Sequence, residues 1–114
     1  MKAKLKQKWI EALESGRYTQ GIGMLRWAAE ERQTEYCCLG VLAEQLGCTW
    51  VDGSVPLFAD GWHNCKSTEL DPWVRDTIQL SDTAQTKLMR MNDGRNEPQR
   101  DFKYIAQWLR DNKI

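Results

Sequence analysis

Apolar residues recur at helical spacing in five segments of this 114-residue chain. In the first segment, Leu5, Trp9, Ile10 and Leu13 fall three or four positions apart, and Gly16 follows as a natural stop. Residues with this spacing share one face of a helix, which can then be buried against a core. The same pattern, with capping residues such as Ser81 and Asp101, predicts helices over residues 3–15, 35–46, 71–78, 81–91 and 101–109.

The segment 35–46 contains the run CCLGVL and is apolar nearly all round. A helix with this composition is expected at the centre of the core, with Thr34 as its N-cap. Gly40 lies inside it, where glycine costs about 1 kcal/mol relative to alanine. We therefore expect another backbone or a large ring to approach Gly40 closely.

Two regions lack helical periodicity. Residues 49–57 contain Asp52-Gly53 between short extended pieces, a pattern typical of a β-hairpin, and Pro56 limits the second piece to an edge. Residues 24–34 are compatible with a strand or a helical turn, and the pattern does not decide between them. The fold class predicted is mainly α (α+β): a single domain, 1–114, of about five short helices with a small hairpin-like insertion.

Charge and composition exclude several classes of protein. Sixteen Lys and Arg residues balance sixteen Asp and Glu residues, so no net field favours nucleic acid or an anionic membrane. No apolar run is long enough to cross a bilayer, and the first sixteen residues lack the apolar segment of a secretory signal. We expect a cytoplasmic protein without membrane contact, whose cysteines stay reduced.

Catalysis and metal binding remain an alternative hypothesis. A thiolate near a helix N-terminus could pair with the one histidine, and cysteines with histidine can bind zinc. However, no C-x-x-C or H-x-x-x-H spacing is present, and cysteine is among the most buried residue types. We therefore expect no cofactor and favour a non-enzymatic protein. The residues of the alternative are Cys37, Cys38, Cys48, His63 and Cys65.

Four motifs in order resemble a family of small proteins widespread in tailed phages and prophages. They are Tyr18-x-Gln20-Gly21, the run CCLGVL, Met91-Asn92-Asp93, and Phe102-x-x-Ile105-Ala106-x-Trp108-Leu109. The stretch from 26 to 35 is longer than usual for that family, and Gln99-Arg100-Asp101-Phe102 replaces its Gly-x-Ser-Phe. The resemblance implies a viral accessory protein in the host cytoplasm and indicates no reaction.

A small-ligand site is one binding hypothesis. Guanidinium groups hold phosphate, free backbone N–H groups nest an anion, and aromatic rings stack on bases. A Gly-x-Gly with arginines and rings in eleven residues combines these groups, although the same residues could simply turn the chain and fill the core. The candidates for a nucleotide-like ligand are Arg17, Tyr18, Gln20, Gly21, Gly23, Arg26 and Trp27.

A protein-binding surface is the other hypothesis. Tryptophans are enriched at the centres of interfaces, and the candidates on the irregular segment are Trp50, Phe58 and Trp62, which could equally act as lids over the core. Sequence-specific DNA binding is not expected, because only five residues follow Leu109 and no recognition helix fits there. The function predicted is that of a phage-type accessory protein that binds and blocks a host component, such as a defence or regulatory factor. Self-association and the target's identity stay open.

Overall fold

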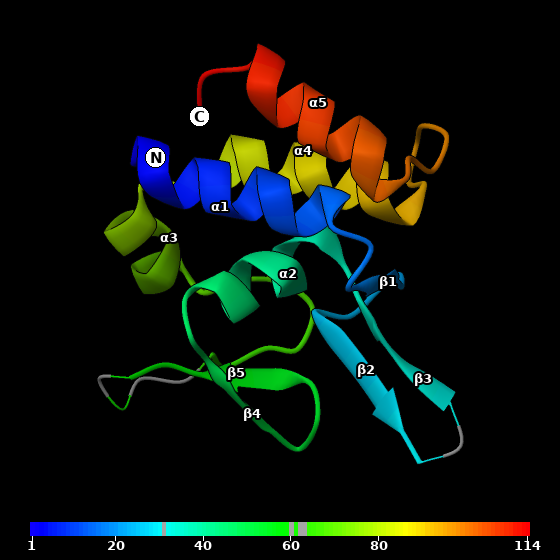
Figure 1. The fold of residues 1–114 in the computed structure, drawn as a ribbon. Coiled ribbons are helices and arrows are strands. Elements are labelled where there is room, and N and C mark those ends of the chain that lie inside the picture. The colour runs from blue at the N-terminus through cyan, green and yellow to red at the C-terminus, as the bar shows by residue number, and fades with distance from the viewer. Residues whose placement is uncertain (31, 60, 62–63) are drawn as a thin grey trace.

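A computed structural model describes residues 1–30, 32–59, 61 and 64–114. Within these residues the chain forms five helices and two small sheets, so it has the predicted α+β class (Figure 1). The elements are α1 Ala3–Glu14, β1 Thr19–Gln20, β2 Arg26–Ala29, β3 Arg32–Tyr36, α2 Cys38–Gln45, β4 Thr49–Val51, β5 Val55–Leu57, α3 Pro72–Ile78, α4 Asp82–Asp93 and α5 Phe102–Asp111.

Helices α1, α4 and α5 lie on one side of α2, and the strand pairs β2–β3 and β4–β5 lie on the other (Figure 1). Helix α1 packs against α5 and α2, and α4 packs against α2 and α5. Both strand pairs extend to the other side of α2, away from α1, α4 and α5 (Figure 1). One cluster of buried apolar residues joins these layers, with contributions from every helix and from Leu25.

Helix α2 is the central buried helix, as predicted. Residues Cys38 to Ala43 are all buried. At Gly40 the backbone of Leu25 comes so close that an added Cβ would lie 1.7 Å from the Leu25 carbonyl oxygen. The expected close approach at Gly40 is therefore confirmed, and its partner is a backbone.

The start of this helix was predicted wrongly. The apolar spacing and Thr34 placed it at residue 35, but residues Arg32–Tyr36 form strand β3, and α2 begins only at Cys38. Strand β3 is the middle of a three-stranded sheet, parallel to β1 and antiparallel to β2. Glu35 and Tyr36 pair with strands on both sides, and this pairing outweighs their helix propensity.

The undecided region 24–34 contains strand β2 and the beginning of β3. Its pairing with β3 shifts register between Trp27 and Ala29, which marks a β-bulge. A bulge breaks the alternation of apolar and polar positions, so the strand carries no clear period-two pattern.

The hairpin predicted at 49–57 is confirmed by antiparallel pairing of β4 with β5. Asp52 and Gly53 have φ angles of 52° and 82°, the positive values that tight hairpin turns need at both central residues. Helix α4 runs two residues past its predicted end, through Asn92 and Asp93, and ends at Gly94.

Candidate functional site

The residues of the phage-family resemblance meet at the buried side chain of Asn92. Its Oδ1 accepts hydrogen bonds from Gln20 Nε2 at 2.9 Å and from the Cys38 backbone N–H at 3.1 Å. Its Nδ2 donates to the Gly21 carbonyl oxygen at 2.9 Å. Asn92 is fully buried, so these contacts join β1, α2 and α4. This part of the motif therefore has a structural role.

The glycine segment between β1 and β2 is held by the same junction. The Gly21 N–H donates to the Tyr36 carbonyl oxygen at 2.8 Å, and the Gly23 N–H donates to Asp93 Oδ1 at 3.1 Å. An anion nest needs backbone N–H groups without acceptors, and here both have one, the second a carboxylate. A Cβ at Gly21 would meet Glu35 Cβ at 2.8 Å, so this glycine allows β1 to approach β3.

The other five candidate residues for a nucleotide-like ligand, apart from Gly21 and Gly23, fall into two groups. Arg17 lies on the surface with its guanidinium 5.8 Å from the Tyr18 ring centroid, and Tyr18 and Gln20 border a hollow of about 310 Å³ beside α1 and α5. Arg26 and Trp27 border a different hollow, next to the β4–β5 turn. The structure therefore does not bring the two arginines to one cradle.

Arg26 belongs to a compact cluster that ties both strand pairs to α2. Its guanidinium lies 5.9 Å from the Tyr36 ring and 5.6 Å from the Trp50 ring, and its Nη1 donates to the Gly53 carbonyl oxygen at 2.9 Å. The Tyr36 hydroxyl and the Trp50 indole N–H both donate to Glu44 Oε1, at 3.0 and 3.2 Å. We call Arg26, Tyr36, Glu44 and Trp50 the arginine–aromatic cluster.

Tyr18 extends this cluster. Its ring packs edge-to-face on Tyr36 at 5.0 Å, and its hydroxyl accepts a hydrogen bond from Gln45 at 3.2 Å. Burial, which is the largest effect, together with the hydrogen bond and charge of Glu44 raises the pKa of Tyr36 above its ordinary value, and Arg26 acts in the opposite direction. Because Arg26, Tyr36, Glu44 and Trp50 are all hydrogen-bonded, these side chains form a fixed support for the two hairpins.

Trp27 lies beside the arginine–aromatic cluster and is 46% exposed. It borders a hollow of about 130 Å³ between β2 and the β4–β5 turn, and Val51 on β4 is also exposed. We call this surface the hairpin face. It consists of the residues that border the hollow, which are Met24, Arg26, Trp27, Ala28, Asp52, Gly53 and Ser54.

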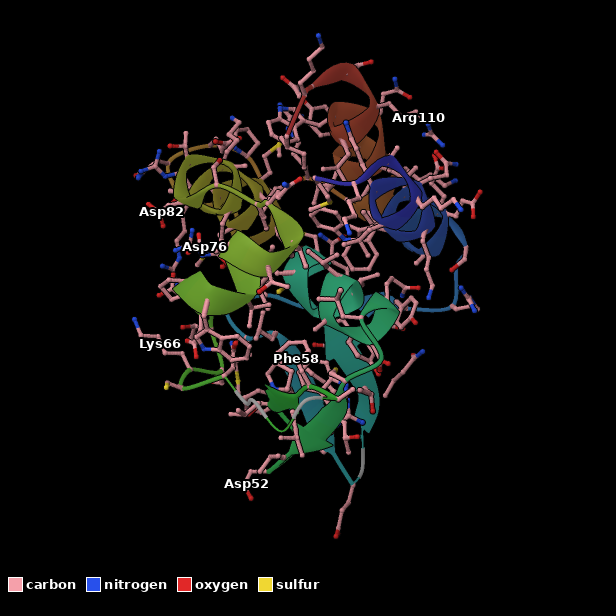
Figure 2. All side chains as sticks on the ribbon, turned by 90° about the vertical axis from the view of Figure 1, so that its left-hand side faces the viewer. Asp52, Phe58, Lys66, Asp76, Asp82 and Arg110 are labelled. Atoms are coloured by element: carbon pink, nitrogen blue, oxygen red, sulfur yellow. The ribbon has the colours of Figure 1, made fainter. Side chains whose placement is uncertain are left out.

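The three candidates for protein binding differ in position. Trp50 is half-buried within the arginine–aromatic cluster. Phe58 is also half-buried and packs edge-to-face on Trp73 at 6.0 Å, below α3 (Figure 2). Both rings cover the core, which is the lid role weighed above. Trp62 lies outside the described residues.

The cysteines of the catalytic alternative differ in how deeply they are buried. Cys37 and Cys38 are buried, Cys48 is half-buried, and Cys65 is exposed, all as free thiols. Burial raises the pKa of Cys37 and of Cys48 to about 12, and raises that of Cys38 well above its ordinary value. These three thiols therefore stay protonated at neutral pH, whereas a nucleophilic cysteine reacts as the thiolate. His63 lies outside the described residues.

No group of three or more His, Cys, Asp or Glu residues in the described ranges is arranged to hold a metal ion. Likewise, none of the helices that the structure describes is long and apolar enough to cross a membrane.

Two features were not found from the sequence. Glu44 links two rings of the arginine–aromatic cluster from α2, but its contacts come from residues on separate strands, so spacing along the chain gives no hint of them. A hollow of about 620 Å³ between the start of α4 and the end of α5 brings together residues 81–90 and 108–114. These residues share no sequence motif. The helical pattern places Trp108 at the edge of the inward face of α5 but does not connect it with a site.

Comparison with known families gave one match. A family model described as "Domain of unknown function (DUF8296)" matches residues 1–74, from α1 to the first residues of α3. Neither the curated proteins nor the solved structures contain a match to this chain.

Proposed function

The chain belongs to the DUF8296 family, whose description assigns no activity, and we propose that it is a non-enzymatic binding protein that engages a partner protein through the hairpin face. The resemblance to phage and prophage proteins suggests that the partner is a host component and that binding blocks it. The hairpin face, centred on Trp27, replaces the earlier candidates Trp50, Phe58 and Trp62 as the contact surface.

The exposure of Trp27 carries this proposal. Tryptophan buries a large area on binding and is enriched among the residues that dominate binding energy. The Trp27 side chain is 46% exposed, and the exposed part of its ring contributes nothing to the buried core. The neighbouring arginine–aromatic cluster holds both hairpins in place, so little conformational entropy is lost when a partner covers them.

The other readings have less support. The N–H groups of Gly21 and Gly23 already donate to Tyr36 and Asp93, which weakens a phosphate site at the glycine segment. The raised pKa values of Cys37, Cys38 and Cys48 weaken thiolate catalysis. Binding of a protein through an exposed aromatic surface needs neither free backbone N–H groups nor a thiolate.

The test is capture of partners from a bacterial host lysate on immobilised protein, followed by affinity measurement with the purified partner. Trp27→Ala should abolish capture and weaken binding by about 30-fold, the effect of losing a hot spot of about 2 kcal/mol. Tyr104→Ala is the matched control, because Tyr104 is 45% exposed but lies on α5.

Capture lost in Trp27→Ala and kept in Tyr104→Ala, with equal thermal stability of both variants, would support the proposal. Capture of the same proteins by wild type and Trp27→Ala would contradict it. So would affinities for the purified partner that differ by less than about five-fold, since a hot spot contributes more than 1 kcal/mol.

A further inference from the structure

The hollow between α4 and α5 is a second candidate site. It has a volume of about 620 Å³, within the range of ordinary small-ligand sites. Its walls come from α4 as far as Arg90 and from the end of α5 with the residues that follow it. The lining residues are Ser81, Asp82, Thr83, Ala84, Thr86, Lys87, Arg90, Trp108, Asn112, Lys113 and Ile114.

Three cationic side chains, Lys87, Arg90 and Lys113, and one carboxylate side chain line this hollow. Lys87 is paired with both carboxylate oxygens of Glu97 at 3.0 Å. By contrast, Arg90 and Lys113 form no ion pair or side-chain hydrogen bond with any described residue. The one acidic side chain in the lining, Asp82, lies 3.6 Å from the Arg75 guanidinium. Two cations thus remain for an anionic ligand.

The uncharged part of the lining suits an aromatic group. Trp108 is half-buried, with part of its ring packed on the core, and it borders the hollow. Its indole N–H has no acceptor among the described residues. Exposed indole faces stack on bases, while the hydroxyls of Thr83 and Thr86 can exchange hydrogen bonds with a sugar.

We propose that this hollow binds a mononucleotide, with the base against Trp108 and the phosphate near Arg90 and Lys113. Arginine gives forked, charge-assisted hydrogen bonds to phosphate oxygens, and lysine adds a point charge. A phosphate ion alone would not use the aromatic wall, and a nucleoside alone would not use the two cations. The mononucleotide is the ligand class that uses both.

This site is separate from the hairpin face. Asp82 borders the hollow between α4 and α5 and Asp52 belongs to the hairpin face, and Figure 2 shows these two residues well apart. The nucleotide site therefore does not depend on the proposed protein partner. It also differs from the earlier nucleotide hypothesis at residues 17–27.

The experiment is a titration of the full chain with AMP, followed by ¹H–¹⁵N NMR and calorimetry, with GMP, CMP and UMP as further probes. We expect at least one nucleotide to bind with a dissociation constant below about 1 mM, the upper end of ordinary substrate constants. The Trp108 indole peak, assigned by its loss in Trp108→Phe, should shift together with backbone peaks of residues 81–90. The matching nucleoside and inorganic phosphate should each bind at least about ten-fold more weakly, because each lacks one set of contacts.

Two variants test the residues. Arg90→Ala, an exposed position, should weaken binding by roughly ten-fold, as expected for a lost charge-assisted hydrogen bond. Arg17→Ala, an exposed arginine at the earlier candidate site, should leave it unchanged. Trp108→Phe keeps an aromatic face and should bind within a few-fold of wild type, and Trp108→Leu should not.

Several results would overturn the proposal. They are an absence of shifts with all four nucleotides up to about 1 mM, equal binding of nucleoside and nucleotide, or shifts confined to residues 17–27 and abolished in Arg17→Ala. Since Trp108 also packs on the core, the thermal midpoint of each variant is measured first. Arg90→Ala tests nucleotide binding without changing a residue that packs on the core, because Arg90 is exposed.

Discussion

Gly40 offers a direct test of how α2 packs, because substitution by alanine has opposite effects in an isolated helix and in this fold. In a helix interior alanine is favoured over glycine by about 1 kcal/mol. In the folded chain the added Cβ would lie 1.7 Å from the carbonyl oxygen of Leu25 and 2.7 Å from its carbonyl carbon. Both are backbone atoms, so no change of rotamer can remove the overlap.

The cost follows from what must move. Real Cβ atoms essentially never lie closer than 3.0 Å to such atoms, so the Leu25 backbone has to retreat from α2. Its carbonyl oxygen accepts from the Cys37 N–H at 3.2 Å, and its N–H donates to the Ser67 carbonyl oxygen at 2.7 Å. Overpacking by about 2 kcal/mol and two hydrogen bonds of about 1 kcal/mol each, less the helix gain, give a loss of about 3 kcal/mol.

Urea denaturation followed by circular dichroism measures this loss as a change in the free energy of unfolding. The pair Gln107→Ala and Gln107→Gly, at an exposed position on α5, gives the pure propensity difference in the same protein. A Gly40→Ala variant that is as stable as wild type, or more stable by the propensity difference, would refute the contact between α2 and Leu25.

Two further predictions concern buried polar groups and thiols. Asn92→Ala should lower the free energy of unfolding by about 3 kcal/mol in the same assay, because it leaves the Cys38 N–H and the Gly21 carbonyl oxygen without partners; a loss below about 1 kcal/mol would show that the junction is not needed. The free energy of unfolding should fall as pH rises above about 9, where thiols of the unfolded chain ionise while Cys37, with a pKa of about 12, stays protonated. For this thiol the free energy of unfolding falls by up to about 1.4 kcal/mol per pH unit. Urea denaturation between pH 8 and about 11 should show a smaller dependence on pH in Cys37→Ala than in wild type, and an equal dependence would contradict the burial of this thiol.

The helices could be predicted from the sequence because their information is local. The stripe of Leu5, Trp9, Ile10 and Leu13 and the caps Ser81 and Asp101 depend on neighbours within about two turns. The hairpin at 49–57 depends on the adjacent pair Asp52-Gly53 in the same way.

The three-stranded sheet could not be predicted, because its order depends on distant pairing. Strand β1 has two residues and pairs with Glu35 and Tyr36, and β2 carries a bulge. The arrangement of the candidate site residues could not be predicted either, because it also depends on contacts between residues that are distant in the sequence. Tyr18 and Arg26 are close in sequence but border different hollows, whereas Gln20, Cys38 and Asn92 are far apart in sequence and meet.

The position of Asn92 bears on how the family match relates to the fold. The matched segment, residues 1–74, contains Gln20, Gly21 and the Cys38 N–H, but the side chain that joins them belongs to α4. Without α4, the buried Cys38 N–H would lose its acceptor, and an unpaired buried donor costs about 1–3 kcal/mol. The core likewise includes Leu88, Ile105 and Leu109. Residues 75–114 therefore complete the fold of the matched segment, and the nucleotide hollow is formed from the part of the chain that does so.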